Sequence, residues 1–256
     1  MIVPDNQSGP SEAGEPLNTF YYSPFSLYSI LVRFAFELGQ SRYPDTSPTV
    51  RLRLVNLQEE ENLTEEYLTV PVLSSASDYG PAQILEESRD ILAWLCSIQP
   101  ELLPGQHRED IEPLLEAFFA FHAKPLAVRA EERSGGISNR AAAMLERTDI
   151  NPENIQRVEA RARIFIDGLV NLIQRQHQDG TSHGQYIFGR DPTVLDAVAT
   201  ALLARLMDMH RNDLLDDTLR SYALGVLGTD EWRKTTQGRP TIYDDSLGKV
   251  ADMKLF

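Results

Sequence analysis

The spacing of hydrophobic residues in the first part of the chain predicts alternating strands and helices. Residues 18–22 form a short apolar and aromatic run, which predicts a β-strand. Residues 27–38 repeat apolar side chains at helical spacing, and Gly39 supplies a helix stop. Residues 49–57 alternate between apolar and polar positions, so we expect a second strand with one buried face.

A predicted hairpin and a further helix complete this first domain. Residues 70–74 and 81–85 form two apolar runs around a serine-rich turn, and residues 86–98 have helical spacing. With a short irregular helix near residues 63–68, the predicted order of elements is βαβαββα. That order is typical of a thioredoxin-like domain, which we assign to residues 17–99.

The next part of the chain shows helical periodicity only. Apolar stripes predict long helices over residues 111–122, 152–173, 194–206 and 214–226. Thr193 and Asp196 have the spacing of a capping box at the start of the third helix. The expected fold class is therefore α/β plus all-α, with a linker at residues 100–106 and a helical bundle over residues 107–240.

Both ends of the chain lack this periodicity. Residues 1–16 are polar, acidic and rich in proline, glycine and serine, so we expect a disordered tail rather than a signal peptide. Residues 241–256 are expected to form a carboxyl-terminal tail. The longest apolar segment, near residues 197–207, is interrupted by Arg205 and is too short to span a membrane.

Charge and cysteine content narrow the function classes. The chain has 256 residues and a net charge of -14, which repels phosphate backbones and anionic lipids, so we expect no nucleic-acid or membrane partner. Cys96 is the only cysteine, which excludes an intramolecular disulfide and indicates a reducing, cytoplasmic location. Cys96 lies on the apolar side of its helix and is expected to be inert. The histidines lack metal-ligand spacing, so we expect no metal site.

Short motifs lie where the predicted strands meet the predicted helices. They are Tyr-Tyr-Ser-Pro-Phe-Ser at residues 21–26, Val70-Pro71 and Glu87-Ser88. Together with residues 188–196 of the helical domain, these motifs resemble the glutathione transferase family over roughly residues 17–236. The chain is most similar to serine-type members, and its acidic amino-terminal extension resembles that of fungal transferases acting on secondary metabolites.

The resemblance implies that a hydroxyl at the start of the first helix keeps the thiol of glutathione ionised. Lowering a thiol pKa of about 8.5 by about two units requires roughly 2.7 kcal/mol. A helix N-terminus contributes about 0.3–1 kcal/mol, or up to ~2, and a hydrogen bond to a charged acceptor about 1.5–3 kcal/mol. One donor therefore suffices. Ser23 is the first candidate and Ser26 the second; Tyr21 or Tyr22 would imitate tyrosine-type members, and either serine could instead only cap the helix.

The resemblance also implies which residues bind glutathione. The Val70 backbone would pair with the cysteinyl residue of the ligand beside a cis Pro71. Ser88 would bind the γ-glutamyl carboxylate at a helix N-terminus, with Glu87 orienting the same end of the ligand. A trans proline and a plain capping pair are the alternatives. Residues 65–69 lack the basic or amide residue usual in the family, so glutathione affinity is weak or its glycyl carboxylate is bound elsewhere.

A hydrophobic, electrophilic second substrate is expected where the two domains meet. The candidate lining residues, which at helical spacing could equally belong to the core, are Phe25, Phe118, Phe119, Phe121 and His122. The resemblance implies a homodimer that transfers glutathione to the electrophile, or adds it reversibly and so isomerises a cis–trans double bond. The alternative function is a non-catalytic binding or assembly module with the same fold. The absence of cysteine from the first turn disfavours a thiol–disulfide reductase.

Overall fold

The computed structural model describes residues 2–4, 18–56, 71–75, 83–121, 152–178 and 184–253. The strands of this part of the chain form one sheet in the order β1-β3-β2-β4-β5. They are β1 (Ile2–Pro4), β2 (Asn18–Tyr22), β3 (Val50–Leu54), β4 (Val72–Ser75) and β5 (Gln83–Leu85). β3 is parallel to both β1 and β2, whereas β4 is antiparallel to β2 and β5. This mixed sheet confirms the predicted thioredoxin-like arrangement.

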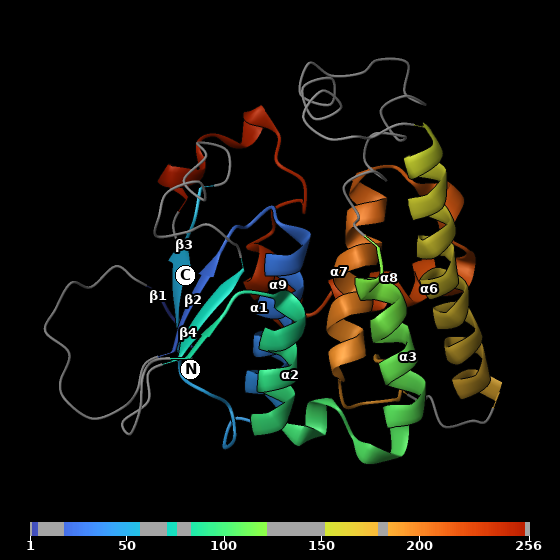
Figure 1. Ribbon diagram of the computed structural model, residues 1–256, viewed down its shortest axis with the longest axis horizontal. Coiled ribbons are helices and arrows are strands. Elements are labelled where there is room, and N and C mark those ends of the chain that lie inside the picture. Colours follow the sequence, from blue (N-terminus) through green and yellow to red (C-terminus); the bar gives the residue numbers. More distant parts are fainter. Residues whose placement is uncertain are drawn as a thin grey trace, which may run out of the picture.

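Helices cover the sheet and then form a separate bundle. The α-helices are α1 (Leu27–Arg42), α2 (Ser88–Ile98), α3 (Arg108–Phe119), α6 (Pro152–Gln178), α7 (Val194–Asp208), α8 (Asp217–Leu227) and α9 (Asp230–Thr236). Short 3-10 helices are η3 (Pro100–Leu102), η4 (Gly105–His107), η5 (Asn212–Leu214), η6 (Asp245–Leu247) and η7 (Val250–Asp252). Figure 1 shows α1, α2 and α9 beside the sheet, with α3, α6, α7 and α8 grouped on the far side of them. The fold class predicted from the sequence is confirmed; the short helix expected near residues 63–68 lies outside the described residues.

The amino-terminal end contributes a strand that the sequence analysis did not predict. Ile2–Pro4 pairs in parallel with β3 at the edge of the sheet, with Ile2 opposite Val50. The prediction of a disordered tail over residues 1–16 is therefore wrong for Ile2–Pro4. An Ile-Val-Pro run suits an edge strand, because proline has no N–H to donate to a second neighbouring strand. Three residues are too short a pattern to predict a strand from the sequence.

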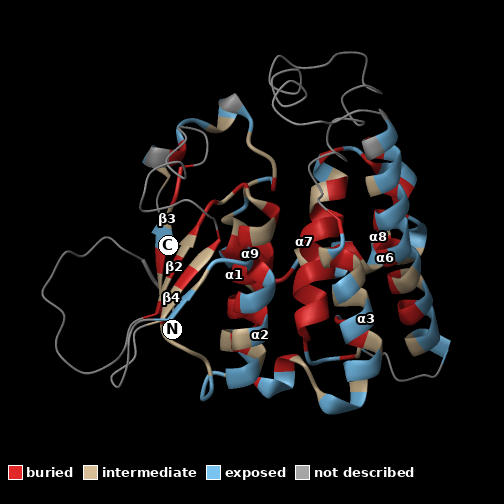
Figure 2. Ribbon diagram, viewed as in Figure 1, coloured by how far each residue is buried: buried red, intermediate tan, exposed pale blue. Residues whose placement is uncertain are grey.

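The helix α1 lies at the centre of the molecule and is buried on nearly all sides. It packs against the sheet domain and against both α7 and α9, and Figure 2 shows how buried positions concentrate along α1 and α7. The sequence predicted that this helix ends at Gly39, but α1 continues to Arg42, so that prediction is wrong. A side chain at Gly39 would instead collide with the amide of Gln99, which donates to the Tyr43 carbonyl at 3.1 Å. Gly39 thus permits close packing of α1 against the end of α2.

The start of α7 is a buried capping box, as predicted. Asp196 is fully buried, and its two carboxylate oxygens accept hydrogen bonds from the Thr193 N–H at 2.8 Å, the Thr193 hydroxyl at 2.8 Å and the Ile187 N–H at 2.9 Å. The Tyr222 hydroxyl of α8 donates to the same group at 2.8 Å. Burial raises the pKa of Asp196, and these hydrogen bonds act in the opposite direction. The carboxylate therefore ties α7, α8 and the loop before α7 together.

Residues 240–253, here named the carboxyl-terminal segment, turn back from α9 towards the sheet (Figure 1). The segment is fixed at its start, where Thr241 is 2% exposed, and near its end, where Val250 is 2% exposed. It includes most of the part expected to form a tail. Within the described residues, no helix combines the length and apolar character that crossing a membrane requires.

Candidate functional site

The register of the sheet brings the first two predicted motifs together. β2 ends at Tyr22, directly before the turn that begins with Ser23. β4 runs antiparallel to β2, with Val72 opposite Tyr21. Pro71 immediately precedes Val72 and is buried, so it adjoins the end of β2 from which the Ser23 turn emerges.

The third motif reaches the same end of the sheet. β5 pairs Leu85 with Leu73 of β4, and because the two strands are antiparallel, β5 ends where β4 begins. Glu87 and Ser88 follow β5 directly at the start of α2. Val70 lies outside the described residues. The start of α1, Pro71 and the start of α2 are thus gathered at one end of the sheet.

Two serines lie at the start of α1 in different environments. Ser26 is the N-cap residue, and its hydroxyl oxygen accepts from the Ser29 N–H at 3.4 Å. Ser26 is half-buried, whereas Ser23 is only 1% exposed and its N–H donates to the Ser29 hydroxyl at 3.2 Å. A hydroxyl has one proton besides its acceptor sites, so Ser26 can cap α1 and still donate outward. The helix end adds a partial positive charge at the same place.

The tyrosines before the turn make contacts with arginines. The Tyr22 hydroxyl accepts from the buried Arg33 guanidinium at 2.6 Å, and Arg33 also donates to the Lys234 carbonyl of α9 at 2.8 Å. Burial raises the pKa of Tyr22, and the nearby Arg33 lowers it. The Tyr21 ring instead packs under the Arg53 guanidinium of β3, 5.6 Å from its centre. The bond to Arg33 disfavours Tyr22 as the thiol donor.

The start of α2 carries an exposed carboxylate and a buried hydroxyl. Glu87 is the N-cap residue by its backbone, with φ -103° and ψ 135°, but its side chain makes no capping hydrogen bond and is exposed. Ser88 is the first residue of α2 and is 4% exposed. The alternative interpretation, in which Glu87 and Ser88 only cap α2, is therefore not supported by the side chain of Glu87.

The aromatic candidates for the second-substrate pocket separate into core and surface positions. Phe118 is 1% exposed, and its ring packs against neighbouring rings of Tyr28, Phe119, Phe121 and Phe165. Phe118 is therefore a core residue, which corrects its assignment to the pocket, and Phe121 is buried beside it at 3% exposure. Phe25 is also buried, at 7% exposure, whereas Phe119 is half-buried and lines the cavity described below. His122 lies outside the described residues.

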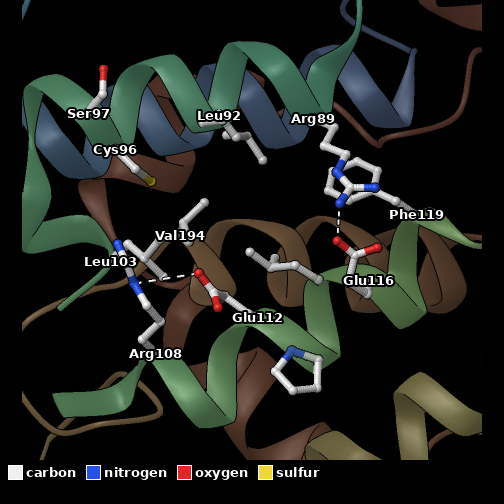
Figure 3. Close-up of a pocket in the computed structure, with 13 residues that line it drawn as sticks. Arg89, Leu92, Cys96, Ser97, Leu103, Arg108, Glu112, Glu116, Phe119 and Val194 are labelled. Atoms are coloured by element: carbon white, nitrogen blue, oxygen red, sulfur yellow. Dashed lines mark hydrogen bonds and ion pairs between the residues drawn. The ribbon is translucent and has the colours of Figure 1, made fainter. Parts of the chain in front are cut away.

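A cavity of about 700 Å³ lies between α2 and α3 (Figure 3). Its apolar lining includes Leu92, Leu103 and Phe119. The Arg89–Glu116 ion pair joins the two helices across the cavity near Phe119, as Figure 3 shows. Only the Phe119 end of this cavity was predicted from the sequence.

The one thiol of the chain, that of Cys96, also lines the cavity. Burial raises the pKa of the Cys96 thiol to about 12, with Arg108 acting in the opposite direction. The thiolate is the nucleophilic form of cysteine, so the raised pKa agrees with the expectation that Cys96 is inert. Over the described ranges, no group of three or more His, Cys, Asp or Glu side chains could hold a metal ion.

Sequence reasoning missed two residues that reach the turn before α1 from elsewhere. Arg205 of α7 donates from its guanidinium to the Phe25 carbonyl at 2.8 Å. Burial lowers the pKa of Arg205 to about 10, and nearby Asp208 acts in the opposite direction. The Tyr243 ring of the carboxyl-terminal segment packs edge-on against Phe25, with ring centres 5.2 Å apart. The sequence did contain a signal for Arg205, a single arginine in an otherwise apolar helix. It contained no signal that Tyr243 would contact the turn before α1.

Solved structures of glutathione transferases share this architecture. A maleylacetoacetate isomerase from Anaeromyxobacter dehalogenans, with dicarboxyethyl glutathione and citrate in its active site, is 22% identical over 88% of this chain and 94% of its own, with a TM-score of 0.56. A glutathione transferase homologue from Lodderomyces elongisporus, with two glutathione molecules per subunit, is 13% identical over 88% of this chain and 100% of its own, with a TM-score of 0.61. A delta-class glutathione transferase from Nilaparvata lugens is 18% identical over 86% and 93% of the two chains, with a TM-score of 0.53.

These similarities concern structure and not sequence. No protein-family model matches the sequence, and no curated protein matches it significantly. A shared fold hosts different reactions, so at these identities it does not assign a chemistry. The gathering of three motifs at one end of a thioredoxin-like sheet, followed by a helical bundle, shows that this chain has the fold of the glutathione transferases.

Proposed function

We propose that the chain is a glutathione-dependent enzyme that adds the glutathione thiolate to an electrophilic carbon of a small hydrophobic molecule. The observation that carries the proposal is the convergence of the hydroxyl-bearing start of α1, Pro71 and the start of α2 at one end of the sheet. Helix N-termini favour anionic groups, and glutathione offers two kinds, a thiolate and carboxylates. The start of α1, with its serine hydroxyl, therefore suits the thiolate, and the start of α2, with Ser88, suits the γ-glutamyl carboxylate.

Ser26 is the proposed donor to the sulfur, ahead of Ser23. The sequence favoured Ser23, but Ser26 is half-buried at the helix N-cap while Ser23 is 1% exposed. The Ser26 hydroxyl accepts from Ser29 N–H at 3.4 Å, and a hydroxyl that accepts one hydrogen bond becomes a stronger donor in the next. Its proton would then point to the sulfur of a bound thiolate.

The remaining contacts follow from the same arrangement. Ser88 would bind the γ-glutamyl carboxylate through its hydroxyl and the amide groups at the start of α2, and the exposed Glu87 carboxylate would pair with the ammonium group of the ligand. Val70 would pair its backbone with the cysteinyl residue. The positions of Glu87 and Ser88 at the start of α2 support their roles, and the role of Val70 rests on the sequence motif alone.

The proposed chemistry begins with loss of the thiol proton to solvent. The sulfur lone pair then forms an S–C bond, and the π electrons of the electrophile move onto its electron-withdrawing group. Protonation of the product, or loss of a leaving group with its electron pair, completes transfer. Alternatively, the former carbon–carbon double bond, now a single bond, rotates before the S–C bond breaks. The double bond then forms again and the thiolate is released unchanged, which is cis–trans isomerisation.

The test is binding and ionisation of glutathione. Isothermal titration should give saturable binding, and the ultraviolet absorbance of the thiolate should appear on saturation at neutral pH. Activity with an aromatic halide measures transfer, and loss of a cis alkene signal by proton magnetic resonance, without consumption of glutathione, measures isomerisation. A protein that neither binds glutathione nor ionises its thiol would have the non-catalytic scaffold role.

We also propose that the protein is a cytoplasmic homodimer. The fold is that of a family in which two subunits usually associate, and the single thiol suits a reducing compartment. Sedimentation analysis distinguishes a dimer from a monomer directly.

A further inference from the structure

The turn that leads into α1 is held at both ends of one peptide group. Pro24 stands at the second position of this turn, where β-turns favour proline. The Ser26 N–H donates to the Ser23 carbonyl at 3.2 Å. The Phe25 carbonyl, which belongs to the same planar peptide group as that N–H, accepts from the Arg205 guanidinium at 2.8 Å. The two hydrogen bonds therefore fix the orientation of the peptide directly before Ser26, the proposed thiol donor.

Arg205 reaches this turn from the helical domain. It is the one charged residue between Asp196 and Asp208 in the sequence, and it lies in the last turn of α7. α7 packs along α1, and Figure 1 shows it as the helix of the bundle that stands beside α1. The hydrogen bond to Phe25 thus joins the start of α1 to a residue that lies 180 positions later in the chain.

The charge of Arg205 is enclosed, but it has no paired anion among the described residues. Its Nε atom is buried without a hydrogen-bond partner there, and the ion pairs of the same ranges do not include Arg205. Burial lowers the pKa of Arg205 to about 10, and nearby Asp208 acts in the opposite direction. One oxygen of Asp208 accepts from the Thr241 N–H and hydroxyl instead, and residues 23–26 carry no charged side chain. A buried charge without a partner is costly, so an anion bound at the start of α1 would offset that cost.

We propose that Arg205 is a positioning residue for the ionisation of glutathione: it orients the peptide before Ser26 and supplies a fixed positive charge for the bound thiolate. The inference rests on the proposed function, because that function places the sulfur at Ser26. Arg205 acts through the Phe25 carbonyl and through its charge, and it does not touch the ligand. The thiol proton still leaves to solvent, and Arg205 gives up no proton.

Two physical effects give Arg205 this role. A peptide group that is bonded on both sides keeps the backbone of Ser26, and with it the direction of the Ser26 hydroxyl, in one orientation. A charge that is already in place needs no reorganisation when the thiol loses its proton. A unit charge roughly 10 Å from the sulfur, at an effective dielectric constant of about 20, lowers a thiol pKa by about one unit. Arg205 therefore adds to the effects of the hydroxyl and the helix end.

The first test removes the charge and the hydrogen bond together. Arg205→Met keeps an apolar stem but cannot donate. On glutathione-saturated protein, the midpoint of the thiolate absorbance should rise by about one unit. If it rises from about 6.5 to about 7.5, the conjugation rate at pH 7 falls about threefold and recovers at higher pH. Because ionisation is linked to binding, the dissociation constant for glutathione should weaken about threefold at pH 7 and stay unchanged at about pH 5, where the bound thiol is neutral in both proteins.

Two conservative variants separate the charge from the hydrogen bond. Arg205→Lys keeps the charge, so the thiolate midpoint should stay within about half a unit of that of the unaltered protein. Arg205→Gln keeps an N–H donor without the charge, so its midpoint should lie clearly above that of Arg205→Lys. These two variants carry the comparison if Arg205→Met does not fold. Equal midpoints in Arg205→Lys and Arg205→Gln would contradict the proposal.

Arg211→Met is the matched control for loss of a buried arginine. The Arg211 side chain is 1% exposed, but it pairs with Glu159 at 3.4 Å and with Asp213 at 2.9 Å. Its loss should lower the thermal midpoint of unfolding and leave the pKa of the bound thiol unchanged. An unaltered thiol pKa in folded Arg205→Met, or an equal rise in Arg211→Met, would overturn the role of Arg205 alone. Failure of the unaltered protein to bind glutathione or to ionise its thiol would overturn the proposed function as well.

Discussion

Replacing Ser26 with alanine tests how the proposed thiolate is stabilised. A hydrogen bond from a hydroxyl to a charged acceptor contributes about 1.5–3 kcal/mol, and one pKa unit corresponds to about 1.4 kcal/mol. Removing the Ser26 hydroxyl is therefore expected to raise the pKa of the bound thiol by about one to two units. If that pKa rises from about 6.5 to about 8, the ionised fraction at pH 7 falls from about three quarters to about a tenth.

The assay is a pH titration of the thiolate absorbance on glutathione-saturated protein. The thiol is neutral below its pKa and anionic above it, so Ser26→Ala should shift the titration midpoint to higher pH. The rate of conjugation at neutral pH should fall severalfold, and it should recover as the pH rises through the new pKa. A variant that is equally slow at every pH would instead have lost positioning or folding.

Ser26 also caps α1, so loss of the cap needs its own control. Replacing an N-cap serine or threonine with alanine costs about 0.5–2 kcal/mol of stability. Thr229→Ala makes the same kind of loss at α9, where the Thr229 hydroxyl accepts from the Trp232 N–H at 3.1 Å. It should lower the unfolding midpoint without moving the pKa of the thiol. A normal pKa in Ser26→Ala together with a raised one in Ser23→Ala would make Ser23 the donor, and normal values in both would refute the hydroxyl mechanism.

Three further predictions concern other parts of the chain. Ser88→Ala should weaken glutathione binding about tenfold, the loss of one hydrogen bond to a charged group, with little change in the pKa of the thiol; titration calorimetry that gives an unaltered dissociation constant would exclude Ser88 from the site. Asp196→Asn should lower the free energy of unfolding by at least about 2 kcal/mol, because an amide cannot accept all the hydrogen bonds made to that buried carboxylate, and an unchanged urea midpoint would contradict this. Burial raises the pKa of the Cys96 thiol to about 12, so Cys96 should react with iodoacetamide at pH 8 about a hundredfold or more slowly in the native protein than in denaturant. Comparable rates would mean that the thiol is accessible and ionised.

The strong periodic signals in the sequence predicted the fold well. The apolar stripe of residues 194–206 predicted α7, and the spacing of Thr193 and Asp196 predicted its capping box. Strict alternation over residues 49–57 predicted β3. These patterns succeed because burial of one face is decided by residues close together in the chain.

Features that depend on distant residues were not predictable in this way. Gly39 resembled a helix stop, but its role is set by Gln99, which packs against it from the end of α2. Phe118 and Phe119 are adjacent and chemically identical, yet one is enclosed by other rings and the other lines the cavity between α2 and α3. Helical spacing alone cannot tell a core ring from a pocket ring, since both lie on the apolar side of the helix.

The candidate site shows the same division. The resemblance to glutathione transferases implied that the starts of α1 and α2 would share one site, and the register of the sheet brings them to the same end. The choice between Ser23 and Ser26 depends on burial, which the sequence does not encode locally. The contact of Tyr243 with Phe25 could not be predicted from the sequence. The segment that carries Tyr243 is held by hydrogen bonds from Thr241 to Asp208, a residue of α7 that is distant in the sequence.

A crystal structure of the protein soaked with glutathione tests the central claim most directly. The account predicts that the sulfur lies within hydrogen-bond distance of the Ser26 hydroxyl and that the γ-glutamyl carboxylate lies at the Ser88 end of α2. Clear density for the tripeptide at another place, or no binding to the start of α1 at saturating concentration, would contradict the account.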